Sequence, residues 1–162
     1  MTKWIYATLA AASLLAVSLV AQQKGAPPAE KLFTSSAEIQ TLIANAKAQR
    51  TKEQPLITQR ILSLAPINAS LEYRGSVGTA AVHETEAEMF YVIEGSAVLT
   101  TGGKLTNETR QNAENLQGSG IEGGKTQAVA KGDFIMVPEK TPHWFSKIDQ
   151  TLVLMSVHIP HK

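Results

Sequence analysis

The spacing of apolar residues changes once along the chain, from a helical pattern to a strand-like one. Ser35 and Glu38 have the spacing of a capping box, in which each side chain satisfies a free backbone N–H at a helix start. Apolar residues then recur at helical intervals from Ile39 to Ala46. The pattern predicts one amphipathic helix over residues 35–50, whose apolar stripe docks on the rest of the domain.

After Pro55 the helical signal ends, and short runs rich in β-branched and aromatic residues follow. Gly, Pro, Asn or Asp separates these runs, which number seven or eight. Such spacing is typical of an all-β sandwich or barrel and not of alternating β/α units. We therefore expect an all-β domain over residues 51–162, preceded by one short helix.

One connection is too long for an ordinary hairpin. Residues 101–125 contain six of the 11 glycines, with Gly102-Gly103 and Gly123-Gly124 at the two ends. Long loops inside compact domains are usually functional or mobile, so the segment is interpreted as a possible flap with flexible ends. A tolerated surface insertion has equal weight, because loop closure becomes costly only slowly with length.

The N-terminus has the layout of a secretory signal. Lys3 precedes an uncharged run from Trp4 to Ala21, and a polar break with Pro27 and Pro28 follows. This predicts a signal peptide over residues 1–21, a linker over 22–34, and an exported protein that is periplasmic or extracellular. A retained membrane anchor is the alternative, since the run is just long enough to span a bilayer.

Composition narrows the class of protein further. A chain of 162 residues with 43% hydrophobic residues is one globular domain's worth. Without cysteine there is no disulfide framework and no thiol for lipid attachment. Fifteen basic and 14 acidic residues, without a basic run, argue against a nucleic-acid partner and against stable membrane association after signal cleavage.

The candidate chemistry depends on four histidines. If His83 closes one strand while Glu88 opens the next, both side chains can point into one cavity. His143 begins another strand, close behind the corner at Pro138. The remaining two, His158 and His161, fall within the last five residues and are interpreted as structural or solvent-exposed.

Two stretches resemble the motifs of the cupins, small antiparallel β-barrels with a metal site near the barrel mouth. The first cupin motif runs G-x5-H-x-H-x3,4-E-x6-G. Glu88 and Gly95 match its second half, and His83 matches its second histidine in the longer spacing. Ala81 stands where the first histidine is expected, and Gly75 or Gly78 matches the leading glycine only loosely.

The second cupin motif, G-x5-P-x-G-x2-H-x3-N, is matched by Gly132, Pro138 and His143. Lys140 replaces its second glycine and Lys147 its asparagine, so Lys140 is expected in a left-handed backbone conformation. The resemblance covers residues 56–160 and implies a double-stranded β-helix, or jelly-roll, barrel. It leaves the activity open, because this fold hosts many unrelated functions.

The resemblance implies a mononuclear metal site held by His83, Glu88 and His143. Two histidines and one carboxylate suit a divalent transition metal (Fe, Mn, Ni or Zn) and leave positions open for substrate or oxygen. The missing ligand should weaken affinity, unless Glu84, Glu86 or Tyr73 replaces it. The alternative is a metal-free pocket in which the three residues bind each other or a ligand.

Other candidate roles follow from position. Glu86 and Tyr73 are candidates for proton transfer. Trp144, Phe90 and Phe134 are candidates for substrate binding, although such aromatic residues more often fill a core.

Three hypotheses remain open at this stage. The first is a metal-dependent enzyme that acts on a small molecule, and the second is a non-catalytic module that binds a sugar or other metabolite in a degenerate, metal-free site. A structural or interaction protein ranks last. Because cupins are often dimers, the resemblance also implies a homodimer in which the Leu56–Ala65 run pairs with a neighbouring subunit.

Overall fold

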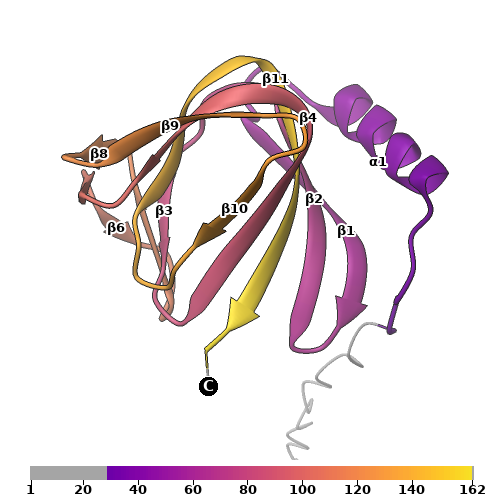
Figure 1. Cartoon of the computed structure of the whole chain (residues 1–162), viewed down its shortest axis with the longest axis horizontal. Coiled ribbons are helices and arrows are strands. Elements are labelled where there is room, and N and C mark those ends of the chain that lie inside the picture. Colours follow the sequence, from indigo (N-terminus) through magenta and orange to yellow (C-terminus); the bar gives the residue numbers. More distant parts are fainter. Residues whose placement is uncertain (1–28, 162) are drawn as a thin grey trace, which may run out of the picture.

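The computed structural model describes residues 29–161, so the predicted signal peptide and most of the predicted linker lie outside the described residues. One helix precedes eleven strands (Figure 1). They are α1 (Ser36–Gln49), β1 (Leu56–Leu64), β2 (Ile67–Arg74), β3 (Ala80–His83), β4 (Glu86–Thr101), β5 (Lys104–Thr106), β6 (Thr109–Arg110), β7 (Asn115–Gly118), β8 (Gly120–Glu122), β9 (Lys125–Ala130), β10 (Phe134–Val137) and β11 (His143–Pro160). Within the described part, no helix is long and apolar enough to cross a membrane.

The helix begins where the capping box predicts. Ser35 Oγ accepts a hydrogen bond from the Glu38 amide at 3.2 Å, and the Glu38 carboxylate accepts one from the Ser35 amide at 2.9 Å. Ile43 and Ala46 are buried and pack against β1 and β2. The predicted amphipathic helix and its docking on the domain are therefore both present.

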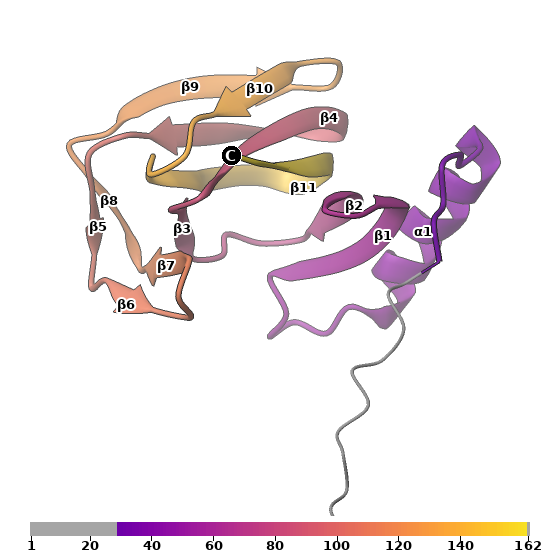
Figure 2. The same ribbon diagram turned by 90° about the horizontal axis from the view of Figure 1, so that it is seen from below.

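Nine strands form one strongly curved antiparallel sheet, which closes into a barrel (Figures 1 and 2). The order β1-β2-β11-β3-β7-β6 forms one path, while β4 pairs with β11, β9 and β10. The predicted all-β barrel with one short N-terminal helix is confirmed.

The two longest strands, β4 and β11, bend together. Their pairing runs from His143 opposite Thr101 to Pro160 opposite Glu86, with a shift in register where Ile148 and Leu152 pair with Ala97 and Gly95. At this corner both strands turn back across the top of the barrel (Figure 1). As a result, the two ends of β11 return to the same side of the molecule.

The curved sheet separates two apolar cores. The inner core fills the end of the barrel near the bend, and Phe90, Leu152 and Leu154 are fully buried there. The outer core lies between α1 and the convex face of β1, β2 and β11, with Leu71 and Ala46 at its centre. Alternation along each strand therefore sends its side chains to two different environments.

The long connection over residues 101–125 is built into the barrel. It forms β5 to β8, in which β5 pairs with β8 and β7 pairs with both β3 and β6. The β3 pairing sets Asn115 opposite His83. The segment that was interpreted as a possible flap or a surface insertion is a folded arm, in which β7 and β6 extend the sheet beside β3.

The chain itself covers part of the β1 edge, which was predicted to pair with a second subunit. Lys31 forms a β-bridge with Ser63, and the Thr34 hydroxyl donates to the Ile61 carbonyl at 2.7 Å. One end of β1 is therefore occupied by the segment that leads into α1. A dimer that pairs along β1 has only the Leu56–Arg60 end of that edge available.

Gly95 should be among the least replaceable residues of the barrel. Its φ is +86°, and an added Cβ would overlap the Thr151 carbonyl oxygen across the bend. Gly102 has a similar φ of +73° but open space around it. Both alanine variants bear the left-handed backbone cost of about 1–2 kcal/mol, and Gly95→Ala must also displace β11.

Urea unfolding should therefore show a clearly larger loss of stability for Gly95→Ala than for Gly102→Ala. Equal losses in the two variants would mean that the close approach at the bend is not a constraint.

Candidate metal centre

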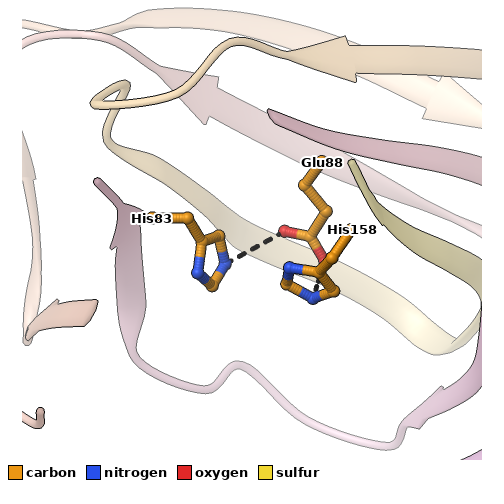
Figure 3. Close-up of side chains that lie close together, drawn as sticks. All are labelled: His83, Glu88 and His158. Carbon is orange, nitrogen blue, oxygen red and sulfur yellow. Dashed lines mark ion pairs between the residues drawn. The ribbon is translucent and has the colours of Figure 1, made fainter. Parts of the chain in front are cut away.

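Three strands deliver four side chains to one end of the barrel interior. His83 closes β3, Glu88 lies near the start of β4, and His143 and His158 lie near the two ends of β11. His158 is directly opposite Glu88 in the β4–β11 ladder, while His143 is opposite Ala81 of β3. Figure 3 shows His83, Glu88 and His158 pointing toward one another from three separate strands.

The Glu88 carboxylate is the centre of this cluster. Its Oε2 lies 3.3 Å from His83 Nε2 and 3.1 Å from His143 Nε2. Its Oε1 lies 3.3 Å from His158 Nε2 and accepts a hydrogen bond from the Ser156 hydroxyl at 2.6 Å. With an exposed fraction of 3%, Glu88 is a buried acid whose neighbours are chiefly imidazoles.

The outer nitrogen of each imidazole lies beside an oxygen. His83 Nδ1 is 2.6 Å from Asn115 Oδ1, and His143 Nδ1 is 3.2 Å from the Thr141 carbonyl oxygen. Glu86 Oε2 lies 2.8 Å from His158 Nδ1, although the geometry of this ion-pair contact leaves that nitrogen without a hydrogen bond. Oxygen acceptors at Nδ1 favour the tautomer whose Nε2 carries no proton and can bind a metal.

The separations between donor atoms fit a single ion. Two ligands that each lie about 2.0–2.1 Å from a tetrahedral ion are about 3.3 Å apart. Candidate ligand atoms of His83, Glu88 and His158 all lie within 4.8 Å of one another. This compact group does not include His143, although His143 Nε2 lies 3.1 Å from the Glu88 carboxylate. The same distances also suit hydrogen-bonded ion pairs between the Glu88 carboxylate and protonated imidazoles.

The cluster shifts the proton affinities of its own members. Burial by itself would raise the pKa of Glu88, but the close His143 and His83 imidazoles, with the charge of His158, hold that pKa far below its usual range. Burial likewise opposes the charged form of His83, yet contacts with Glu88 and Asn115 outweigh it and raise the pKa of His83. Without a metal, the cluster therefore favours an ionised carboxylate beside imidazolium.

The structure brings together the three residues that the sequence analysis proposed as ligands, His83, Glu88 and His143, and adds a fourth residue. His158 is not merely structural or exposed: its Nε2 reaches the same carboxylate as His83 and His143. The available signal was the even spacing of Ser156 and His158 with the buried Leu152 and Leu154, which sends all four side chains inward. His158 lies outside both cupin motifs in the sequence, so the motifs did not indicate it.

The corner at Pro138 holds His83 from the opposite side. Lys140 has a φ of +59°, which confirms the left-handed conformation expected where the cupin motif has glycine. Its backbone amide donates to the His83 carbonyl at 2.7 Å. The stretch that matches the second motif is therefore hydrogen-bonded to the strand that carries His83 of the first motif.

The remaining sequence candidates lie in different places. Glu86 lines the outer cavity, and its Oε2 lies 2.8 Å from His158 Nδ1. Tyr73 is not brought to the site, because it is on the opposite face of β2, buried in the outer core under α1. Glu84 pairs with Arg110 at 2.6 Å and does not contact the cluster.

The three aromatic residues proposed for substrate binding lie in three different parts of the barrel. Phe90 lies beneath the cluster, with its ring centroid 6.1 Å from that of His143, as part of the inner core. Trp144 is partly buried, and its indole nitrogen donates to the Gly78 carbonyl at 2.9 Å. Phe134 is on the outer surface, 71% exposed beside Tyr91, because its place on β10 points out of the barrel.

Two cavities meet at the cluster. An inner one of about 200 Å³ is lined by Glu88, His143 and the ion pair of Glu72 with Arg74. An outer one of about 410 Å³ opens between β2, β3 and β7. Both cavities are lined by Ala81, His83, Gln117 and His158. Ala81, which replaces the first histidine of the cupin motif, is therefore part of the wall between the two cavities.

No protein-family model matches the sequence, and no curated protein matches it either. Similar solved structures include BH2720 from Bacillus halodurans, at 16% identity and a TM-score of 0.52, with 82% of this chain and 83% of that chain covered. KdgF from Halomonas is similar at 16% identity and a TM-score of 0.50, covering 70% and 87%. A cupin superfamily protein from Desulfitobacterium hafniense has 11% identity and a TM-score of 0.47, covering 72% and 87%.

The pKa shifts predict an unusual pH dependence for protein stripped of metal with a chelator. The lowered pKa of Glu88 contributes stability above about pH 4.3, which is lost as the pH falls through its folded-state value. The raised pKa of His83 contributes stability below about pH 6.5, which is lost as the pH rises through its folded-state value. The metal-free protein should thus melt at a higher temperature near about pH 5.5 than near about pH 8.

Differential scanning calorimetry at the two pH values measures this difference. His83→Gln should reduce it, because glutamine does not titrate. An unchanged difference in that variant would show that the pH dependence arises elsewhere.

Proposed function

We propose that the chain is an exported, metal-dependent cupin that acts on a small molecule, because its barrel is similar to those of solved structures and carries residues of both cupin motifs. The metal is a single divalent transition ion (Fe, Mn, Ni or Zn), held by His83, Glu88, His143 and His158. This set keeps the three ligands predicted from the sequence. The fourth ligand comes from the end of β11 instead of position 81.

The observation that carries this proposal is the common orientation of the three imidazoles. Each turns Nε2 toward Glu88 and has an oxygen next to Nδ1. A hydrogen-bonded cluster needs only one such partner to neutralise the carboxylate. Three imidazoles oriented in this way around one buried acid are the expected arrangement of a metal-ligand set with its outer shell.

Different residues would have different roles in such a metal site. A bound ion would polarise an oxygen of the substrate or lower the pKa of a bound water. Asn115 and the Thr141 carbonyl orient His83 and His143, and Glu86 is placed to orient His158. Phe90 closes the inner side of the cluster and excludes water from it.

A non-catalytic binding module is the second candidate function, and Ala81 is the observation that favours it. This alanine stands where a cupin ligand is expected and leaves a small side chain on the wall common to both cavities. In such a module the cluster is a metal-free ion-pair network and the cavities hold a metabolite.

Metal content separates the two candidates. Plasma mass spectrometry of the mature, untagged protein should find close to one metal ion per chain. A His83→Ala/His143→Ala variant should lose it, because half of the ligands are removed. Folded wild-type protein that contains no metal and cannot be reloaded would favour the binding module.

The assignment of His158 as the fourth ligand has its own test. His158→Ala should weaken metal binding by at least about tenfold, as even the loss of an outer-shell partner does. His161→Ala is the matched control, since His161 contacts Glu139 and not the cluster. Chelator competition measures the affinity of each variant.

A substitution at position 81 should have the opposite effect and strengthen metal binding. Ala81→His in the His158→Ala background should recover much of the lost affinity, because residue 81 is opposite His143 and lines the same cavity. If His158→Ala binds metal as tightly as wild type, His158 is not a ligand.

A further inference from the structure

The strand β2 has two unlike faces. Its outward residues are buried under α1: Ala69, Leu71 and Tyr73. Its inward residues are all polar and line the two cavities: Asn68, Ser70, Glu72 and Arg74. Apolar side chains usually fill the interior of a small barrel, so this polar wall opposite the metal centre needs a separate explanation.

Glu72 and Arg74 form an ion pair at the inner end of this wall. Arg74 donates from Nη2 at 2.6 Å and from Nε at 2.9 Å, and both bonds go to the same oxygen, Glu72 Oε2. The two side chains are only 14% and 9% exposed. The guanidinium also lies over the Phe145 ring, 5.0 Å from its centroid, which fixes its position.

Half of this pair remains available for hydrogen bonding. Among residues 29–161, neither Arg74 Nη1 nor Glu72 Oε1 has a side-chain hydrogen-bond partner, and both residues line the 200 Å³ cavity next to Glu88 and His143. The pair thus offers a donor and an acceptor side by side. Their opposite charges largely cancel.

A hydroxyl group is the chemical partner that suits both atoms, because it donates and accepts at once. A carboxylate can only accept, so it would gain from Arg74 and be repelled by Glu72. An ammonium would face the reverse conflict. The pair therefore selects for an uncharged group with hydroxyl character over either ion.

The outer cavity has the same chemistry. Apart from the cluster and Glu86, its polar lining consists of uncharged side chains: Asn68, Ser70, Gln111, Asn112, Asn115 and Gln117. Arg74 is the only lysine or arginine that lines either cavity in the described part of the chain. Amide and hydroxyl side chains provide many directional hydrogen bonds without net charge, as a ligand with several hydroxyl groups requires.

We infer that the small molecule bound at this site is a neutral polyhydroxylated compound of the sugar class, with one hydroxyl held between Glu72 and Arg74. This rests on the proposed function, since the same molecule would present an oxygen to the metal centre. The inner cavity is smaller than the roughly 300–1,000 Å³ of drug-sized pockets, which suits one sugar ring or a short polyol.

Two matched probes test the charge selection. D-galactose and D-galacturonate share one ring and differ in a hydroxymethyl group against a carboxylate. D-glucose, D-mannose, D-xylose and myo-inositol extend the neutral set, and D-glucuronate extends the charged one. Isothermal titration calorimetry on metal-loaded protein should detect at least one neutral probe, with a dissociation constant of about 1 mM or below.

Replacing the whole ion pair avoids leaving a buried charge without a partner. Glu72→Leu/Arg74→Met keeps a similar volume, and such replacements of buried pairs often preserve stability. Glu84→Leu/Arg110→Met removes another Arg–Glu pair outside both cavities and is the matched control. The first variant should lose neutral-probe binding by at least about tenfold while the control keeps it.

Metal content measured on the same samples separates this inference from the proposed function. Metal in every sample, with galacturonate binding more tightly than galactose or with no neutral probe binding, overturns the sugar assignment and leaves the metal site standing. Unchanged sugar affinity in the Glu72→Leu/Arg74→Met variant overturns the role of the pair. Sugar binding by wild-type protein that cannot hold metal would support the ligand class and refute the metal-dependent activity.

Discussion

The buried carboxylate of Glu88 is the constraint on which this end of the barrel depends. An ionised acid in an apolar interior is costly unless several partners compensate it. Here the compensation comes from a hydroxyl and three imidazoles on two other strands, β3 and β11. The position of Glu88 therefore requires β3 and β11 to place polar side chains around its carboxylate. This requirement holds both for direct contacts with the imidazoles and for contacts through a bound metal.

Bending makes this meeting possible. An 18-residue strand that ran straight would hold its two ends far apart, yet His143 and His158 reach the same carboxylate. The turn of β4 and β11 at Gly95 brings both ends back to one side of the barrel. A backbone conformation that glycine enters without strain thus contributes to a site made of histidines.

The two faces of the curved sheet have different functions. Its convex face is apolar and covered by α1, and this outer core stabilises the strands from outside. The concave face is then free to be polar along β2, beside the cluster. The folded arm adds to this face, because β7 carries Asn115 to His83 and closes one side of the outer cavity.

The sequence by itself determined the features that depend on local pattern. Helical and alternating periodicities predicted α1 and the strands, and the two cupin motifs predicted the barrel, the strained backbone at Lys140 and three residues of the cluster. These features follow from short-range backbone preferences and from spacing within a single stretch of chain. Periodicity also indicated which residues of a strand share a face.

Only the tertiary structure decided which face of each strand looks into the barrel and which distant residues meet there. It placed His158 opposite Glu88, turned Tyr73 under the helix and left Phe134 on the surface. It also folded residues 101–125 into four short strands, of which β6 and β7 join the barrel sheet and β5 and β8 pair with each other. Each of these outcomes depends on strand pairing between residues far apart in the chain, and pairing is set by the bend and closure of the whole barrel, which no local pattern encodes.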